Sequence, residues 1–277
     1  MNKLLLRTLT GAVYVALIVA GLLWGGLTAF SLICTLFALL GMTEFLRMTK
    51  GDLKKHRATF VADLAIGLSI AAFPALAQGA LNSIFILTLE ISSLILLRGV
   101  MQLYIRSEQP AKDIALSVLS VLYVAVPLML AGIIVDAGGP EIMLLIFIMI
   151  WLNDTGAFLV GSAFGRHRLF ERLSPKKSWE GFFGGLAFCL TAGYLAPVLL
   201  PGSFTGSSLT YVILGLIVCV FSTWGDLFES MIKRAAGVKD SGNILPGHGG
   251  ILDRIDSILF VVPASLIYLT ATTFIGI

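Results

Sequence analysis

Hydrophobic residues in this chain form long continuous runs that short polar segments separate. Each run holds about 20 residues with few charges, which lets a helix cross the ~30 Å hydrocarbon core of a bilayer. Because the runs do not alternate with polar residues, helices are expected and not the strands of a barrel. The pattern predicts nine spans, at residues 8–26, 28–46, 59–77, 83–103, 113–134, 141–161, 180–200, 209–230 and 255–276.

Composition indicates the same class of protein. The chain of 277 residues is 57% hydrophobic and 13% charged, whereas soluble domains are about 45–50% apolar and about 25% charged. We therefore predict an all-α integral membrane protein.

The first run lacks a small-x-small cleavage site and is interpreted as a retained span, not as a signal peptide. No disulfide framework is expected, because the cysteines lie inside apolar runs without metal-like spacing: Cys34, Cys189 and Cys219.

Basic residues are concentrated at the N-terminus and in the connections after the second, fourth, sixth and eighth spans, with Arg98 inside the fourth span as the exception. The positive-inside rule places these segments in the cytoplasm and, with nine spans, the C-terminus outside. The basic face suits anionic lipid headgroups or a polyanionic soluble substrate. We expect one polytopic membrane domain over residues 1–277. Its N-terminal helical half, with the first five spans, is 1–140, and the half expected to carry the function, with most of the intramembrane polar residues, is 141–277.

The longest of these connections runs from Met231 to Arg254 and combines glycines with both signs of charge. Glycine allows backbone amides to approach an anion, and lysine and arginine neutralise phosphate charge. Asp253 and Asp256 share a face if the last helix begins there, which suits Mg²⁺ bound together with phosphates. The alternative is a flexible, solvated basic loop. The candidate residues are Lys233, Arg234, Lys239, Asp240, Gly247, His248, Gly249, Gly250, Asp253 and Arg254.

Carboxylates inside spans are costly in hydrocarbon and are therefore candidates for function. Asp226 and Glu229 share a face near the cytoplasmic end of the eighth span, with Ser230 close by. The alternative is a carboxylate at headgroup level, paired with a basic residue of the next segment. Asp154 lies deep in the sixth span and needs a partner or a metal from another helix. Other charges in spans are expected to pair or to extend to the interface: Glu44, Asp63, Glu90 and Arg98.

The segment Ser174–Gly181 leads into the seventh span with a second anion-binding pattern. Ser174 followed by Pro175 is a helix-start signal, and a helix N-terminus flanked by lysines attracts anions. The alternative is ordinary helix capping with anchoring of the chain at the membrane surface. The candidates are Ser174, Lys176, Lys177, Ser178 and Glu180.

The run from Ser230 to Asp256 resembles the signature of the phosphatidate cytidylyltransferases, also called CDP-diacylglycerol synthases. That signature reads S-x-x-K-R-x4-K-D and, after a spacer, P-G-H-G-G-x-x-D-R-x-D. The chain supplies Ser230, Lys233, Arg234, Lys239, Asp240, Pro246, Gly247, His248, Gly249, Gly250, Asp253, Arg254 and Asp256. The segments SPKKSWEG and WLNDTGAFLVG resemble further elements of the family, so the resemblance covers about residues 150–260.

The resemblance implies a dimeric membrane enzyme that joins phosphatidate and CTP into CDP-diacylglycerol and pyrophosphate in phospholipid biosynthesis. It also implies Mg²⁺, with a monovalent ion such as K⁺ admitted beside it, in a polar cavity near the cytoplasmic face. Metal ligands are expected among Asp226, Asp253, Asp256 and Asp154, the first three close together and Asp154 below them. Catalytic residues are expected to be Asp226, Asp253, Asp256, Lys233 and Arg234. Substrate contacts are expected from the remaining candidates of the two segments and from Ser230.

The nucleophile of that reaction is a phosphate whose second pKa lies near ~6, so no strong base is needed. We therefore expect His248 to hydrogen-bond a phosphate or the loop. The expected partners are CTP, phosphatidate, membrane lipid and a second copy of the chain, without nucleic acid. The expected location is a bacterial cytoplasmic (inner) membrane, with the site facing the cytoplasm.

Other functions stay open. The nearest are a CTP-dependent polyprenol kinase and a cytidylyltransferase for a different lipid phosphate, which differ only in the acceptor groove. A transporter is an alternative of another class, although transporters tend to have inverted repeats and sites at the midplane. In this chain the polar residues gather at one face and in one half. A structural scaffold would not need the costly carboxylates.

Overall fold

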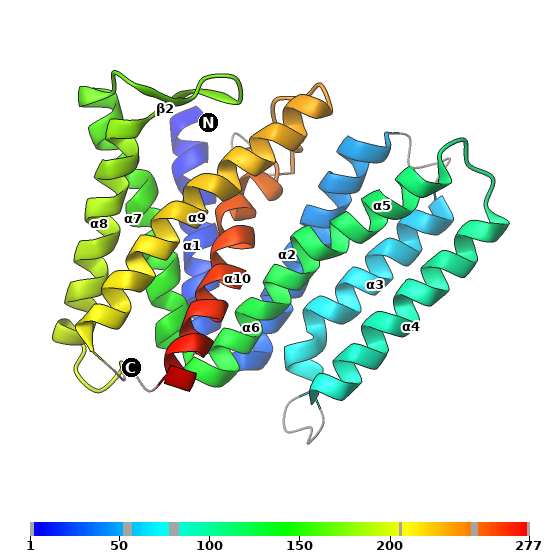
Figure 1. The fold of residues 1–277 in the computed structure, drawn as a ribbon, viewed down its shortest axis with the longest axis horizontal. Coiled ribbons are helices and arrows are strands. Elements are labelled where there is room, and N and C mark those ends of the chain that lie inside the picture. Colours follow the sequence, from blue (N-terminus) through cyan, green and yellow to red (C-terminus); the bar gives the residue numbers. More distant parts are fainter. Residues whose placement is uncertain (1–2, 52–56, 78–82, 205–206, 245–248, 276–277) are drawn as a thin grey trace. The chain divides into compact units, whose positions relative to one another are not determined.

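The computed structural model describes residues 3–51, 57–77, 83–204, 207–244 and 249–275. Helices account for most of these residues, and two short antiparallel strands form a hairpin (Figure 1). The elements are α1 (Lys3–Leu23), α2 (Gly26–Lys50), α3 (Arg57–Leu76), α4 (Ser83–Tyr104), α5 (Pro110–Ser120), η1 (Val121–Ala125), α6 (Val126–Gly138), α7 (Pro140–Phe164), β1 (Arg168–Phe170), β2 (Ser174–Ser178), α8 (Trp179–Leu199), α9 (Ser208–Ala235) and α10 (Leu252–Ile275).

Each predicted span coincides with helical structure, so the expectation of an all-α integral membrane protein is confirmed. Among the described residues, eight helical segments are long and apolar enough to cross a membrane, and α1 adds a shorter apolar stretch at Thr8–Leu23. The fifth span is not one regular helix, because the turn Val121–Ala125 between α5 and α6 is π-helical. The three cysteines are free and buried.

The connection predicted at residues 231–254 is shorter than expected. Helix α9 continues to Ala235, and α10 begins at Leu252. Lys233 and Arg234 lie in the last turn of α9, and Asp253 lies in the first turn of α10. Cations stabilise the C-terminus of a helix, and an anion stabilises its N-terminus. The charged residues that the sequence placed in a loop therefore favour the longer α9 and the earlier start of α10.

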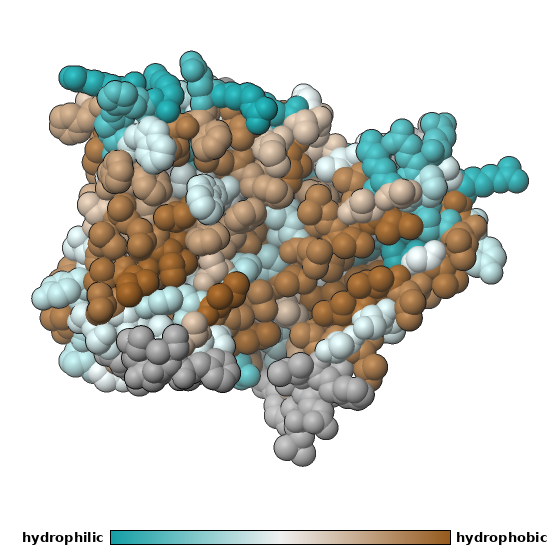
Figure 2. Space-filling view, in the orientation of Figure 1, coloured by the Kyte–Doolittle hydropathy of each residue, from teal (hydrophilic) through white to brown (hydrophobic). Residues whose placement is uncertain are grey.

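The chain divides into two compact units, and each is described by itself. The first consists of residues 1–136 and 240–255, and the second of residues 137–239 and 256–277. In each unit, Figure 2 shows hydrophobic residues along the sides of the helices and the most hydrophilic residues at one end. This is the distribution expected of helices that lie in a bilayer.

The first unit is built around α2, whose buried side chains include Phe30, Phe37 and Phe45. Its largest helix contact is with α3, where a Cβ atom on Gly67 would collide with the sulfur of Met42. The absence of a side chain at this position lets the two helices approach closely. In a membrane such van der Waals packing stabilises helix association, because lipid tails are as apolar as the side chains.

The second unit packs α7, α8 and α9 through small residues. A Cβ atom on Gly184 of α8 would lie 2.5 Å from Val160 and 2.8 Å from the carbonyl oxygen of Gly156, both on α7. On the other side of α8, a Cβ atom on Gly215 of α9 would lie 2.5 Å from the carbonyl oxygen of Cys189. Glycines therefore set the spacing of these helices, as in other membrane bundles.

Replacing Gly184 with alanine tests this packing. We expect Gly184→Ala to destabilise the protein by about 1–3 kcal/mol, because the added methyl group overpacks the contact of α7 with α8. The matched control is Gly99→Ala in α4, where a Cβ atom meets nothing within 4 Å. That change should leave stability unchanged or raise it by up to about 1 kcal/mol. Thermal unfolding in detergent measures both, and equal midpoints for the two variants would contradict the proposed role of Gly184.

Candidate active site

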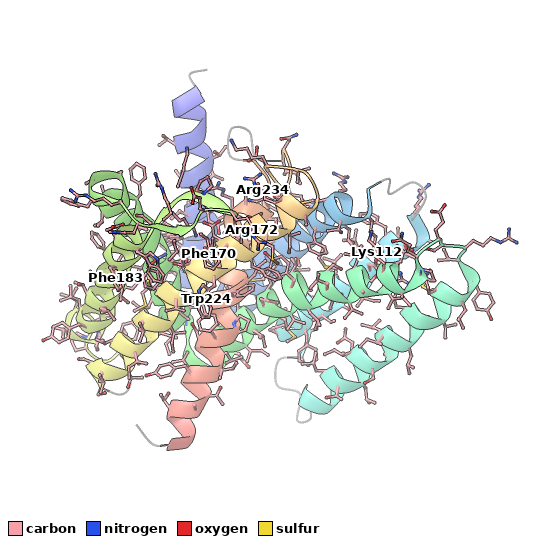
Figure 3. All side chains as sticks on the ribbon, turned by 45° about the horizontal axis from the view of Figure 1, so that its top comes forward. Lys112, Phe170, Arg172, Phe183, Trp224 and Arg234 are labelled. Atoms are coloured by element: carbon pink, nitrogen blue, oxygen red, sulfur yellow. The ribbon has the colours of Figure 1, made fainter. Side chains whose placement is uncertain are left out.

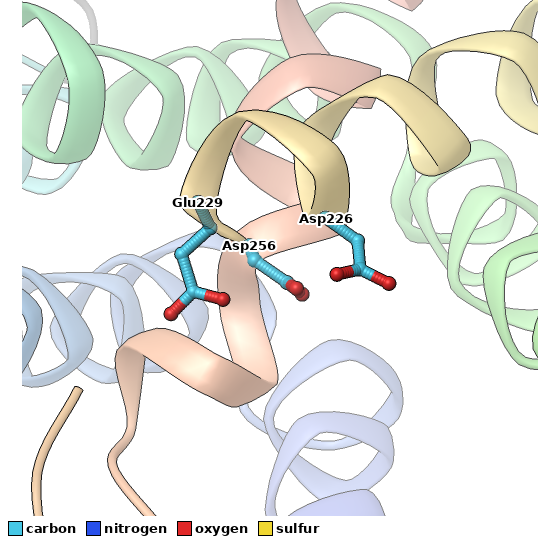
Figure 4. A group of neighbouring side chains, drawn as sticks. All are labelled: Asp226, Glu229 and Asp256. Carbon is cyan, nitrogen blue, oxygen red and sulfur yellow. The ribbon is translucent and has the colours of Figure 1, made fainter. Parts of the chain in front are cut away.

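Three carboxylates from two helices meet in the second unit. Asp226 and Glu229 lie on α9 and Asp256 on α10, and each contributes one oxygen to a group whose members all lie within 4.8 Å of one another (Figure 4). Glu229 is buried, and Asp226 and Asp256 are half-buried. The helices approach closely beside this group, since a Cβ atom on Gly225 would lie 2.6 Å from the carbonyl oxygen of Asp256. This close approach brings the Asp256 side chain to the carboxylates of α9.

Two lysines partly balance the three carboxylates. Lys177 of β2 lies 2.7 Å from Asp226, and Lys233 lies 2.6 Å from Glu229 one turn further along α9. The Lys177 ammonium also donates to the carbonyl oxygen of Thr223 at 3.4 Å. With every group ionised, three negative and two positive charges leave one negative charge at the group. An arrangement of oxygen ligands with excess negative charge attracts a hard cation.

A cavity of about 440 Å³ adjoins Asp226 between α7, α8, α9 and the hairpin. This is within the usual size of small-molecule sites, about 300–1,000 Å³. Its lining combines acidic residues, basic residues and apolar side chains, namely Asp154, Asp226, Arg168, Lys176, Lys177, Phe158, Leu169 and Phe182. A cavity of this composition can hold an anionic group and an apolar group side by side.

The hairpin corrects the prediction that Ser174 and Pro175 start the seventh span. Residues Ser174–Ser178 form β2, which pairs with β1, and the helix begins only at Trp179. The capping residue is Ser178, whose hydroxyl oxygen accepts a hydrogen bond from the Gly181 amide at 3.1 Å. Both serines are suitable caps, but strand pairing holds the backbone of Ser174 in an extended conformation. In β2, Lys176 is exposed and Lys177 is half-buried, and both line the same cavity.

Glu180 holds the backbone before the hairpin. Its carboxylate accepts hydrogen bonds from the amides of Arg166 and His167 at 3.1–3.2 Å, and it lies 2.6 Å from Nδ1 of His167. Glu180 therefore fixes the turn that leads from α7 to β1. Its predicted contact with a substrate stays a prediction.

In the first unit, two carboxylates bind the loop that precedes α10. Asp253 accepts hydrogen bonds from the amides of Ser241 and Gly250 and from the Ser241 hydroxyl, at 2.8–3.0 Å. Glu44 of α2 accepts from the Ser241 hydroxyl and from the amides of Ile251 and Leu252, at 2.9–3.1 Å. Glu44 therefore caps the N-terminus of α10 from another helix.

The structure brings together part of the predicted metal group. Asp226 and Asp256 share the carboxylate group, and Asp154 lines the same cavity as Asp226. The third member is Glu229, for which the sequence left pairing with a basic residue as an alternative. Asp253 belongs to the first unit, where it binds loop amides, and its role as a metal ligand stays a prediction.

The remaining predicted residues of the C-terminal segment have varied surroundings. The Ser230 hydroxyl donates to Asp226 at 3.3 Å. Arg234 is exposed at the end of α9 (Figure 3), where it donates to the carbonyl oxygen of Val238 at 3.1 Å. The exposed residues also include Lys239, Asp240 and Arg254.

Gly249 adopts a positive φ of 82°, a conformation that favours glycine. Gly247 and His248 lie outside the described residues, so their roles stay predictions.

The sequence reasoning missed the contacts of Glu44. A glutamate within an apolar helix was a visible signal of a buried partner, but the partner atoms are backbone amides, 207 and 208 residues further along the chain. Backbone amides carry no signature in the sequence. Only the packing of the first unit shows which amides bind Glu44.

Glu44→Gln tests the capping of α10. The amide NH₂ group that replaces one oxygen faces backbone N–H donors, so the charged hydrogen bonds to Ile251 and Leu252 weaken. We expect amide hydrogen exchange in the peptide containing these residues to become about tenfold faster or more, in line with the loss of a hydrogen bond to a charged group. Glu90→Gln in α4 makes the same chemical change elsewhere. Exchange that is equally fast in both variants, or unchanged in Glu44→Gln, would show that Glu44 does not hold this loop.

Comparisons with known proteins agree on one family. The sequence matches the cytidylyltransferase family over residues 5–272. It is 36% identical over 257 residues to a phosphatidate cytidylyltransferase of Staphylococcus haemolyticus (strain JCSC1435), a match that covers 93% of this chain and 95% of the relative. It is 35% identical over 262 residues to one of Staphylococcus aureus (strain COL), with the same coverage. A phosphatidate cytidylyltransferase of Haemophilus influenzae is 43% identical over 127 residues, 45% of this chain and 44% of that protein. The chain belongs to the cytidylyltransferase family.

Proposed function

We propose that the chain transfers the cytidylyl group of CTP to phosphatidate, which gives CDP-diacylglycerol and pyrophosphate. A phosphate oxygen of phosphatidate forms a bond to the α-phosphorus of CTP, and the bond from that phosphorus to the β-phosphate bridging oxygen breaks. The observation that carries this proposal is the carboxylate group of Asp226, Glu229 and Asp256 beside a cavity lined with both lysines and aromatic residues. The names of the bacterial relatives support the choice of phosphatidate as the acceptor.

The carboxylate group fits Mg²⁺. Its ligand atoms are all oxygens, they lie within 4.8 Å of one another, and the two paired lysines leave an excess of negative charge. Mg²⁺ prefers oxygen ligands and binds a few carboxylates together with substrate phosphates. We assign Asp226, Glu229 and Asp256 as the residues that hold it, with Asp154 and Asp253 as further candidates and K⁺ as a second ion. When bound, the ion neutralises phosphate charge and stabilises the pyrophosphate leaving group.

The basic residues of the cavity bind the phosphates and position them. Lys177 is about one-quarter exposed and Asp226 more than one-third exposed, so their ion pair lies at the edge of the cavity. An ammonium group in this position can exchange its carboxylate for a phosphate oxygen with little movement. Arg168 and Lys176 line the same cavity and supply further positive charge. Positioning and charge neutralisation are the main requirements of transfer at phosphorus.

The apolar part of the site suits the lipid substrate. Phe158 and Phe182 line the cavity, and Trp179 and Phe183 form an aromatic group with Phe182 in the first turns of α8. Figure 3 shows Phe170 on the hairpin and Phe183 on α8. Tryptophan is enriched where membrane meets water, so Trp179 at the start of α8 indicates that this end of the unit is suited to a headgroup-level site. We assign it to the cytoplasmic face of a bacterial inner membrane, and the enzyme to a homodimer.

Transfer of label from CTP to lipid tests the proposed reaction. Purified protein with phosphatidate and Mg²⁺ should move ³²P from the α-position of CTP into the lipid phase and none from the γ-position, because pyrophosphate leaves. Asp226→Asn and Asp256→Asn should each reduce the rate by more than about 100-fold, since even outer partners of a bound metal cost about 10- to 100-fold. Asp136→Asn, at an exposed aspartate of α6, is the matched control and should keep the wild-type rate.

The position of the label also separates the alternatives. Label from the γ-position in the lipid indicates a CTP-dependent lipid kinase. Label from the α-position with another lipid phosphate, but not with phosphatidate, indicates a different acceptor. Absence of lipid label from folded protein with any lipid phosphate contradicts an enzyme of either kind and favours a transporter.

Removal of divalent ions tests the metal. We expect EDTA to abolish label transfer and excess Mg²⁺ to restore it. The carboxylate oxygens of Asp226, Glu229 and Asp256 are negatively charged and can interact with phosphates only through a cation. In a thermal unfolding assay without substrate, Mg²⁺ should raise the midpoint of the wild type but not that of Asp256→Asn. Activity that survives EDTA, or an equal Mg²⁺ shift in both proteins, would exclude this carboxylate group as the metal site.

A further inference from the structure

A buried ionic cluster joins four helices of the first unit. Lys50 of α2 lies 2.7 Å from one carboxylate oxygen of Asp63 in α3, and Nε of Arg98 in α4 lies 2.8 Å from the other. The hydroxyl oxygen of Ser117 in α5 lies 2.8 Å from Asp63, 3.0 Å from Lys50 and 3.2 Å from Arg98. Nη1 of Arg98 donates to the side-chain oxygen of Gln102 at 2.9 Å.

The cluster holds more positive than negative charge. Its salt bridges join two cations, Lys50 and Arg98, to one anion, Asp63, and the three side chains are at most 4% exposed. A buried net charge in a membrane protein is costly unless a counter-charge or a polar partner compensates it. A further negative group beside Arg98 would therefore be bound favourably.

Two donors of the cluster lack an acceptor within the part of the chain that the structure describes. They are Nη2 of Arg98 and Nε2 of Gln102, both fully buried. Leaving a buried donor without a hydrogen bond costs about 1–3 kcal/mol, and more for a charged group. Of the two, Arg98 carries the charge, and its free Nη2 favours an oxygen that carries negative charge.

A small cavity of about 80 Å³ adjoins Arg98 between α3, α4 and the helix formed by α5 and η1, and Gln102 lies outside its lining. Asp63, Arg98 and Ser117 form its polar part, and isoleucines dominate the rest: Ile66, Ile70, Ile91, Ile95 and Ile114. Ile95 is also 56% exposed, so the cavity opens to the outer side of α4. A ligand that fits has an anionic head and an aliphatic chain.

The depth of the cluster suits a lipid headgroup. Asp63 lies six residues after the start of α3, and Arg98 lies six residues before the end of α4. At ~1.5 Å per residue, both are roughly 9 Å from the helix ends. This end of the unit carries hydrophilic residues (Figure 2), among them the exposed Lys112 at the start of α5 (Figure 3). The site therefore lies below a hydrophilic surface and not at the middle of the bilayer.

We propose that this bay, defined by Asp63, Arg98, Ser117, Ile91 and Ile95, binds an anionic phospholipid. A phosphate oxygen accepts a hydrogen bond from Nη2 of Arg98, and part of one acyl chain lies against Ile91 and Ile95. The cavity holds only a short part of the chain, and the rest lies along the outer side of α4. None of these residues belongs to the carboxylate group of the second unit, so the proposal does not depend on the proposed function.

Native mass spectrometry of the purified protein tests the proposal with two lipids that are not acceptors of the reaction. They are dioleoyl phosphatidylglycerol, which is anionic, and dioleoyl phosphatidylcholine, which is zwitterionic. We expect one phosphatidylglycerol per chain to be retained about tenfold more tightly than phosphatidylcholine. Both phosphates can accept the hydrogen bond, but the choline cation of phosphatidylcholine is repelled by the excess positive charge of the cluster. Asp256→Asn should retain phosphatidylglycerol equally, which separates this outcome from failure of the proposed reaction.

The variants distinguish the head from the chain. Gln102→Leu removes the oxygen that accepts from Nη1 of Arg98 and so leaves the guanidinium without its positioning partner. Ile95→Trp fills the apolar part without altering the ionic cluster, and each change should weaken retention about tenfold. Leu96→Trp is the matched control, because Leu96 is 70% exposed and lies outside the cavity lining. Thermal unfolding verifies that each variant is folded, and Ile95→Trp decides the test if Gln102→Leu does not fold.

Three results would overturn the proposal. The first is equal retention of the two lipids, and the second is equal loss in Ile95→Trp and Leu96→Trp. The third is displacement of phosphatidylglycerol by millimolar inorganic phosphate, which would indicate a site for a free anion and not for a lipid.

Discussion

The cost of charge among membrane helices is the constraint on which this structure depends. An ionised carboxylate in hydrocarbon needs a counter-charge or several hydrogen bonds. Asp63 receives two cations and a hydroxyl, and Glu44 receives backbone amides and a hydroxyl. Each compensation joins different helices, neighbours in the sequence around Asp63 and helices about 200 residues apart at Glu44. The polar groups that endanger insertion into a bilayer therefore also determine which helices pack together.

The second requirement is that helix backbones approach closely. It follows from the need to compensate buried charge, because short side chains reach their partners only across a small gap. A short carboxylate such as Asp256 reaches the side chains of α9 only where the two helices nearly touch, and Gly225 permits that distance. A glutamate in its place would reach further but would lose more side-chain entropy on becoming ordered. Small residues thus serve the site as well as the packing, since they set how far each functional side chain has to extend.

The sequence was sufficient for the features that depend on local spacing. Continuous apolar runs gave the spans, and a separation of three residues placed Asp226 and Glu229 on one face of α9. The remaining features depend on contacts between distant segments. The close approach of α9 and α10 at Gly225 brings Asp256 to the carboxylates of α9, and strand pairing decides that Ser178 and not Ser174 caps α8. Where two neighbouring residues satisfy the same local rule, tertiary structure selects between them.

The hydrogen bonds of the glycine-rich loop give its glycines a different role from the one that the sequence predicts. The sequence suggested that glycine there frees backbone amides for a phosphate. In the structure the Gly250 amide donates to Asp253, and the amides of Ile251 and Leu252 donate to Glu44. A Cβ atom on Gly250 would collide with the Ser241 hydroxyl and with Glu44, so this glycine is required by the carboxylate that caps the helix. Because these amides are already bonded, a phosphate that approaches them has to be bound by side chains, of which Arg254 is exposed beside them.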